Sequence, residues 1–124
     1  MDRKILLLGF DALPAILAVD AAVRPFGAEL VPVARTDYNK TLAVLAGLDA
    51  APGPAMPYAG GSLGGRMLVL CGLEKELDGL LPALARSGAG PDCLKAVLTD
   101  TNRSWTAVGL YSELLRERQA MQGR

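Results

Sequence analysis

Apolar residues occur along the chain in short continuous runs that are separated by longer stretches with helical spacing. The runs Ile5–Leu8 and Met67–Cys71 are each followed by a glycine, a pattern typical of strands buried on both faces of a sheet. Two further runs lie at Leu30–Ala34 and Leu94–Leu98, and Pro32 predicts an edge strand or a bulge for the first of them. The pattern therefore predicts four strands in two pairs.

Helical spacing of apolar residues separates the two strands of each pair. Asp11 is placed to cap the first helix. The apolar stripe of the second helix comprises Leu77, Leu80, Leu81 and Leu84. Pro82 is expected to kink this second helix or to move its start toward Asp78. Gly27 and Gly90 stand where a left-handed residue would end each helix.

A last helix is expected in each half, after Asn39 and after Asn102. The C-terminal one is the longer, from about Ser104 to Gln119. Its apolar face comprises Trp105, Val108, Tyr111, Leu114 and Leu115. We therefore expect Trp105 to lie on the first turn of this helix and to be buried against the sheet.

The two halves of the chain align with each other at an offset of 63 residues. Nine identical pairs occur without a gap over residues 3–48, among them Arg3 with Arg66. The motif Thr-Asp-x-Asn-[Lys/Arg]-[Thr/Ser] begins at Thr36 in one half and at Thr99 in the other. We interpret this likeness as a duplicated strand-helix-strand-helix unit.

This organisation predicts an α/β fold in a single domain, residues 1–124. Its repeats span residues 3–48 and 66–111, residues 49–65 link them, and the final helix continues to about residue 119. Each strand-helix-strand unit crosses over right-handedly, so each half contributes a parallel pair to a four-stranded sheet with helices packed on it. The sheet is mixed if a pseudo-two-fold axis relates the halves, and parallel throughout if the winding is continuous.

Composition and charge exclude several classes of protein. Of 124 residues, 51% are hydrophobic and 21% charged, which is typical of a globular chain. The 13 basic and 13 acidic residues are spread evenly over both halves, so neither nucleic acid nor an anionic membrane is expected as a partner. The chain has no histidine, which excludes Ser-His-Asp catalysis and His-ligated zinc.

Further features favour a cytoplasmic protein without metal or cofactor. Cys71 and Cys93 lie in apolar runs, without a second pair to complete a metal or redox motif, and we interpret both as small core residues. The apolar run near the N-terminus is too short for a signal peptide, and no run is long enough to span a membrane. The glycine-rich segment Gly60–Gly65 precedes a strand and lacks the lysine of a phosphate-binding loop.

The second half resembles a known family of short bacterial domains. The run Met67–Cys71, a leucine-rich helix, the stretch Thr99-Asp-Thr-Asn-Arg-Ser-Trp-Thr106 and a Glu/Leu/Arg helix together resemble domain-of-unknown-function family 3783. The resemblance covers about residues 66–121, and the first half would be a diverged copy. It implies a bacterial α/β module with no established activity and supplies no catalytic residues.

The repeated Thr-Asp-x-Asn motif is the strongest candidate site. It lies between a strand and a helix in each half, where α/β proteins bind ligands and where helix N–H groups attract anions. The candidate residues are Thr36, Asp37, Asn39, Thr99, Asp100, Thr101 and Asn102. The competing interpretation is that these residues cap helices, since Asn, Asp and Thr are the side chains that a cap requires.

Three functions follow, and the first is favoured. It is a non-enzymatic binding or assembly module that acts as a homodimer or on a protein partner. The alternative is a small-ligand pocket formed jointly by the two Thr-Asp-x-Asn loops. The third is a magnesium-dependent hydrolase that uses Asp37 and Asp100, with Asp11 and Glu74 at the preceding strand ends.

Overall fold

The computed structural model describes residues 3–50 and 56–122. The strands are β1 (Lys4–Leu8), β2 (Glu29–Pro32), β3 (Met67–Cys71) and β4 (Leu94–Val97). The helices are α1 (Leu13–Val23), α2 (Leu42–Leu45), α3 (Leu77–Arg86) and α4 (Ala107–Gln122). Short 3₁₀ turns occupy Arg24–Phe26, Arg35–Asp37 and Glu74–Glu76. The expected alternation of strands and helices is thus present in both halves.

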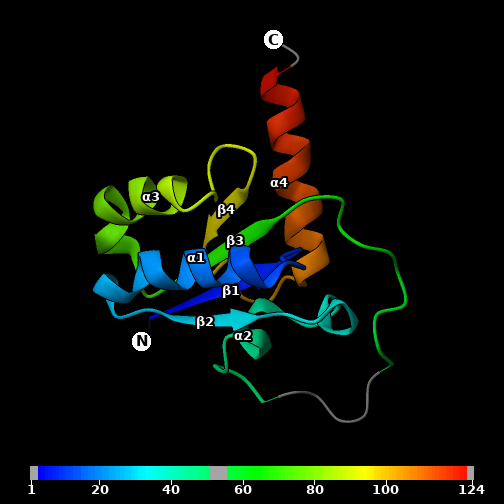
Figure 1. Ribbon diagram of the computed structural model, residues 1–124. Helices are drawn as coiled ribbons and strands as arrows, with labels where there is room; N and C mark the ends of the chain where they lie inside the picture. The colour runs from blue at the N-terminus through cyan, green and yellow to red at the C-terminus, as the bar shows by residue number, and fades with distance from the viewer. Residues whose placement is uncertain (1–2, 51–55, 123–124) are drawn as a thin grey trace.

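The four strands form one mixed sheet in the order β2-β1-β3-β4 (Figure 1). Strands β1 and β2 are parallel, β3 and β4 are parallel, and β1 runs antiparallel to β3. The predicted α/β fold is confirmed, and of the two arrangements left open the antiparallel junction is the one adopted. Strand β2, which ends at Pro32, lies at the sheet edge, where a residue without a backbone N–H is tolerated.

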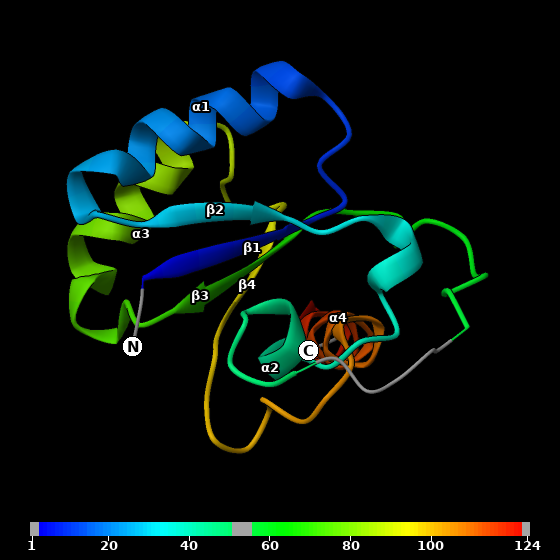
Figure 2. The same ribbon diagram turned by 90° about the horizontal axis from the view of Figure 1, so that it is seen from below.

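Helices cover both faces of the sheet, as Figure 2 shows. Alternate residues of β1 and β3 face opposite layers, and nearly all of them are fully buried. Leu6 and Val69 pack in the core beneath α2 and α4, whereas Leu7 and Leu70 pack in the core beneath α1 and α3. The continuous apolar runs are therefore explained by burial of both central strands on both sides.

A two-fold relation is visible in the register of the sheet. At the offset of 63, Leu6 corresponds to Val69, and these two residues lie directly opposite each other in the β1–β3 pair. The second strands depart from this offset, because Lys4 pairs with Glu29, 25 positions on, whereas Met67 pairs with Leu94, 27 positions on. From the second strand onward, corresponding residues are therefore 65 positions apart.

Several local expectations need correction. The left-handed glycine after α3 is Gly88, with φ of 100°, and not Gly90, whereas Gly27 does take a positive φ of 68°. Helix α3 contains Pro82 and begins at Leu77, next to Asp78, in agreement with the start that the proline predicted. Helix α4 begins at Ala107, so Trp105 lies in the turn before it and is 39% exposed rather than buried. The indole was expected in the core because the helix was expected to begin earlier.

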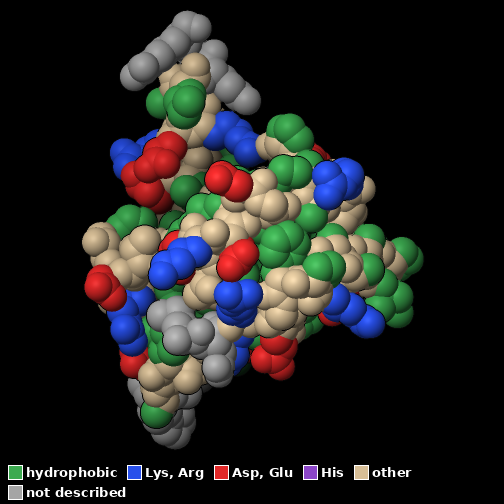
Figure 3. Space-filling view, turned by 90° about the vertical axis from the view of Figure 1, so that its left-hand side faces the viewer, with side chains coloured by type: hydrophobic (Ala, Val, Ile, Leu, Met, Phe, Trp, Pro, Cys, Tyr) green, Lys and Arg blue, Asp and Glu red, His purple; other side chains and the backbone are tan. Residues whose placement is uncertain are grey.

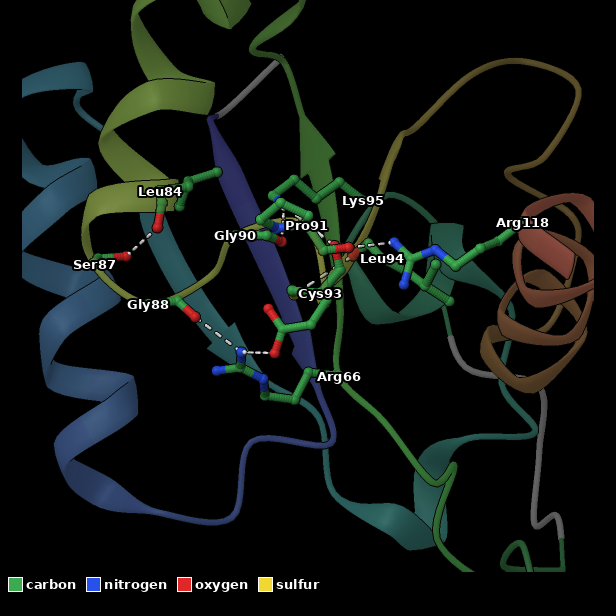
Figure 4. Close-up of polar contacts among 11 residues, drawn as sticks. Arg66, Leu84, Ser87, Gly88, Gly90, Pro91, Cys93, Leu94, Lys95 and Arg118 are labelled. Carbon is green, nitrogen blue, oxygen red and sulfur yellow. Dashed lines mark hydrogen bonds and ion pairs between the residues drawn. The ribbon is translucent and has the colours of Figure 1, made fainter. Parts of the chain in front are cut away.

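The loop between α3 and β4 is held by a group of polar contacts that Figure 4 shows. Arg66, just before β3, donates to the Gly88 carbonyl and pairs with Asp92. Lys95 of β4 donates to the Gly90 carbonyl at 2.8 Å. Arg118 of α4 donates to the Pro91 carbonyl at 2.7 Å. Charged side chains therefore hold the backbone of this loop in place. The contact from Arg118 also connects α4 to the loop beyond the buried first turns of the helix.

Candidate functional site

The Thr99–Asn102 turn after β4 is held together by the side chain of Asn102, which is 9% exposed. Its Oδ1 accepts from the Thr99 N–H at 2.8 Å, and its Nδ2 donates to the Val97 carbonyl at 3.0 Å. The Thr99 hydroxyl accepts from the Asn102 N–H at 3.1 Å. The polar atoms of Asn102 are therefore engaged within the protein, while Asp100 and Thr101 are exposed.

The corresponding turn in the first half has a different construction. The Asp37 carboxylate pairs with Lys40 at 2.9 Å, in a half-exposed ion pair. Asn39 is exposed and donates from Nδ2 to the Met56 carbonyl at 3.0 Å. The Thr36 carbonyl accepts from the Tyr58 N–H, so this turn anchors the segment that leads to β3.

The two turns lie at opposite ends of the sheet. Each follows the carboxyl end of its strand, but β2 and β4 run in opposite directions and form opposite edges. The expected pocket shared by both Thr-Asp-x-Asn loops is therefore wrong, and so is a shared magnesium site of Asp37 and Asp100. The cause is the antiparallel β1–β3 junction, which no local pattern in the sequence specifies.

The turns do not cap the last helices either. The caps are Thr41 and Thr106, whose hydroxyls accept from the Val44 and Gly109 N–H groups. These threonines lie opposite each other in an isolated antiparallel bridge and are related by the offset of 65. Each expected cap is therefore displaced toward the C-terminus, from Asn39 to Thr41 and from Asn102 to Thr106.

At this bridge, here called the crossing, each half supplies hydrogen-bond acceptors for the first N–H groups of the other half's last helix. The Leu42 N–H donates to the Trp105 carbonyl, and the Ala107 N–H donates to the Lys40 carbonyl. The next N–H group of each helix donates to the opposite half as well, Ala43 to Arg103 and Val108 to Tyr38. Because these N–H groups already have acceptors, the N-termini of α2 and α4 do not offer the expected anion site.

A cavity lies at the carboxyl ends of each parallel pair of strands, the usual location for ligands in open α/β sheets. The one beyond β3 and β4 has a volume of about 290 Å³ and is lined by Glu74, Asp100 and Arg103, among others. Arg103 also pairs with Asp49 at 3.3 Å. Of the expected residues, this small cavity brings together Glu74, Thr99 and Asp100.

The cavity beyond β1 and β2 is larger, about 560 Å³. It is lined by Asp11 and by residues outside the predicted site, including Arg35, Tyr38 and Arg66. Ser62–Gly65, the second part of the glycine-rich segment, forms another part of its wall. Tyr38 occupies the variable position of the first Thr-Asp-x-Asn motif and Arg35 directly precedes that motif, so the residue pattern singles out neither of them.

A third surface feature is the outer side of α1 and α3, here called the α1–α3 face. Its exposed apolar side chains include Leu13 at 64%, Leu17 at 57% and Leu81 at 39%. A groove of about 530 Å³ runs between the two helices and is lined mainly by small residues such as Ala22, Gly79 and Ala83. Hydrophobic side chains gather along the right-hand edge of Figure 3, with few charged ones among them.

The two cysteines lie in the core, as predicted. Cys71 is 1% exposed and Cys93 is 2% exposed, and both are free thiols. Burial raises the pKa of the Cys71 thiol to about 11, and burial also raises the pKa of Cys93. Both thiols are therefore protonated near neutral pH and are poor nucleophiles.

Two further observations bear on the kind of site present. Within residues 3–50 and 56–122, no group of three or more His, Cys, Asp or Glu side chains is placed to hold a metal ion. None of the helices in that part of the chain is both long and apolar enough to cross a membrane.

Comparison with known proteins bears on the second half of the chain. No curated protein and no solved structure shows a significant match. One family model matches, described as "Domain of unknown function (DUF3783)", over residues 66–121. This confirms the resemblance expected from the sequence, over the segment that contains β3, α3 and β4 and nearly all of α4. Residues 66–121 are therefore similar to the DUF3783 family.

Proposed function

We propose that this protein is a non-enzymatic assembly module that self-associates through the α1–α3 face. The observation that carries the proposal is the exposure of Leu13 and Leu17 on a helix whose only charged residue is Asp20. A surface helix normally carries charged residues on its outer side, and one that is apolar all round is normally buried. A partner surface would provide the missing burial.

Helix α3 supplies the argument for a second copy of the chain as that partner. Its exposed side begins with Asp78, continues through Leu81 and Pro82, and ends with Arg86. Two such helices packed antiparallel about a two-fold axis at Pro82 would place each Asp78 opposite the other copy's Arg86. This pattern is self-complementary, as a symmetric interface between identical chains must be.

The groove between α1 and α3 supports the same arrangement by its shape. Small residues at Ala22, Gly79 and Ala83 leave space between the two helices. A leucine of one copy could therefore enter the groove of the other. Full burial of a leucine side chain contributes about 1.5–3 kcal/mol, and the leucines of both copies together must exceed the free-energy cost of association.

The first test introduces a charge into the centre of the face. Leu17→Glu should convert the dimer to a monomer, measured by sedimentation equilibrium over a range of protein concentrations, because a buried carboxylate without a partner is costly. Met56→Glu is the control, since Met56 is 86% exposed and lies outside the face. A wild-type protein that stays monomeric at all concentrations would overturn the proposal.

A charge-swap series tests the antiparallel α3 contact directly. Asp78→Arg and Arg86→Asp should each weaken the dimer, because each variant places like charges opposite each other across the axis. The double variant restores opposite charges and should recover much of the lost affinity. If the double variant loses as much dimer affinity as the two single variants lose together, α3 does not pair in this way.

Two further proposals concern origin and location. We propose that the chain is a duplication of one unit, supported by the opposed Leu6–Val69 pair and by the reciprocal hydrogen bonds around Thr41 and Thr106. We also propose that it works in the bacterial cytoplasm. The two free, buried cysteines support a reducing compartment.

A further inference from the structure

The cavity beyond β1 and β2 lies apart from the α1–α3 face and has the size of a small-ligand site. Its volume of about 560 Å³ falls within the range that such sites occupy. Gly9, at the end of β1, has a φ of 78° and lies against the Gly65 carbonyl so closely that a side chain at Gly9 would overlap it. Backbone of the glycine-rich segment therefore forms one wall of the cavity.

Two hydrogen-bond donors in the lining lack an acceptor within the described part of the chain. Tyr38 is only 4% exposed; its hydroxyl oxygen accepts from the Gly9 N–H at 3.1 Å, but its own hydrogen has no acceptor among residues 3–50 and 56–122. Arg35 has no carboxylate within ion-pair distance in the same part of the chain. A buried hydroxyl and a guanidinium that line one cavity would both be satisfied by an anionic oxygen pair.

The remaining charges of the lining set the charge of the ligand. Arg66 already has partners within the protein, since it pairs with Asp92, donates to the Gly88 carbonyl and lies over the Phe10 ring at 5.1 Å. Asp11 contributes a negative charge to the lining. With Arg35 the only uncommitted cation among the described lining residues, the cavity suits a singly charged anion, and Asp11 disfavours a doubly charged phosphate.

The related cavity beyond β3 and β4 shows that this chemistry is specific to the first half. By the offset of 65, Asp100 stands where Arg35 stands in the first half, and Arg103 replaces Tyr38. The corresponding cavity thus has a carboxylate in the position of the guanidinium. An anion should therefore bind at the β1–β2 end and not at the β3–β4 end.

We propose that the β1–β2 cavity binds a short-chain organic monocarboxylate. The planar guanidinium of Arg35 pairs with the two carboxylate oxygens, and the Tyr38 hydroxyl donates to one of them. The partly buried side chain of Leu63 and the glycine backbone face the alkyl part of the ligand. Asp11 accepts from a hydroxyl or amino substituent where the ligand carries one.

The experiment is a titration of the ¹⁵N-labelled full chain with sodium acetate, sodium L-lactate and sodium butyrate, followed by amide chemical shifts. The expected result is a saturable shift of the Gly9, Gly64 and Gly65 amides, with the dissociation constant in the millimolar range usual for so small a ligand. The Asp100 and Thr101 amides of the other cavity should not shift. Sodium chloride at equal ionic strength controls for screening.

Variants of the two donors test the assignment. Arg35→Gln should weaken binding by about tenfold or more, and Tyr38→Phe by about fivefold. Arg116→Gln is the matched control, because Arg116 is an exposed arginine of α4 paired with Glu113, and its variant should bind like wild type. Arg35 is exposed and outside the core, so its variant is expected to fold.

Three outcomes would overturn the proposal. The first is an absence of saturable shifts, or shifts that chloride reproduces. The second is an affinity in Arg35→Gln within about twofold of wild type, since the guanidinium is the proposed anchor. The third is tighter binding of inorganic phosphate than of any carboxylate, which would contradict the charge argument based on Asp11.

Discussion

At the residue scale, Asn102 shows how a polar side chain can be essential to a turn without contacting any ligand. Its carboxamide bridges the Thr99 N–H and the Val97 carbonyl at the end of β4, which is an edge strand. The neighbouring Asp100 belongs to the same motif but lies in solvent. Two adjacent members of one motif therefore have different roles, which depend on burial.

Asn102→Ala should lower the free energy of unfolding by about 1–3 kcal/mol, because it removes buried hydrogen bonds and leaves backbone groups without partners. Asp100→Ala should change it by less than about 0.5 kcal/mol, as is usual for an exposed side chain. Urea unfolding of both variants measures the difference. Equal losses would show that Asp100 has a structural role that its exposure does not reveal.

At the element scale, the contact between the end of β1 and the glycine-rich segment explains a feature that composition alone presents as a linker. Gly9 has a positive φ, and it is pressed against Gly65 with no space for a Cβ. Gly65 in turn is close to the Tyr111 hydroxyl of α4. Glycines are needed at this point because three chain segments meet here. The glycine-rich segment therefore forms part of the folded structure and is not a flexible linker.

Gly9→Ala should destabilise the protein by more than the cost of a left-handed alanine, which is about 1–3 kcal/mol. Gly27→Ala is the matched control, because Gly27 has a similar φ of 68° but no atom within 4 Å of the new Cβ. The difference between the two variants in thermal unfolding isolates the steric contact with Gly65. If both variants lose the same stability, the close approach contributes nothing.

At the scale of the whole molecule, each half completes the other. Strand β1 covers the inner edge of β3, and the crossing at Thr41 and Thr106 supplies acceptors for the first N–H groups of α2 and α4. The 56-residue segment that matches the family therefore has an unpaired strand edge when the first half is removed. A domain of that size also buries a smaller fraction of its surface than the full chain does.

Residues 66–121 alone should be unfolded at low concentration and should fold on dimerisation, with β3 pairing antiparallel to β3 of a second copy at Val69. The pairing reproduces the opposition of Leu6 and Val69 in the full chain. Circular dichroism as a function of concentration measures the transition, and the full chain should show no such dependence of its secondary structure. A folded monomer of this segment at high dilution would contradict the expectation.

The order of the elements, the burial of β1 and β3, the edge position of β2 and the likeness of the second half to its family were all determined by the sequence itself. These features depend on short-range periodicity, on a proline that cannot donate, and on a local motif around Thr99–Thr106. The sequence also predicted the resemblance between the halves. It did not reveal that the second half has two more residues between its strands than the first half has. They shift the relation from 63 to 65 positions, which separates Thr36 from Thr99 as structural equivalents.

The direction of β3 relative to β1 was decided only by the tertiary structure. Both strands are apolar on both faces, so neither face carries a polar pattern that would favour a parallel or an antiparallel partner. That one choice places the turns after β2 and β4 at opposite ends of the sheet and leaves a separate cavity at each end. Candidate sites composed of distant segments depend on such long-range pairing, which local sequence patterns do not encode.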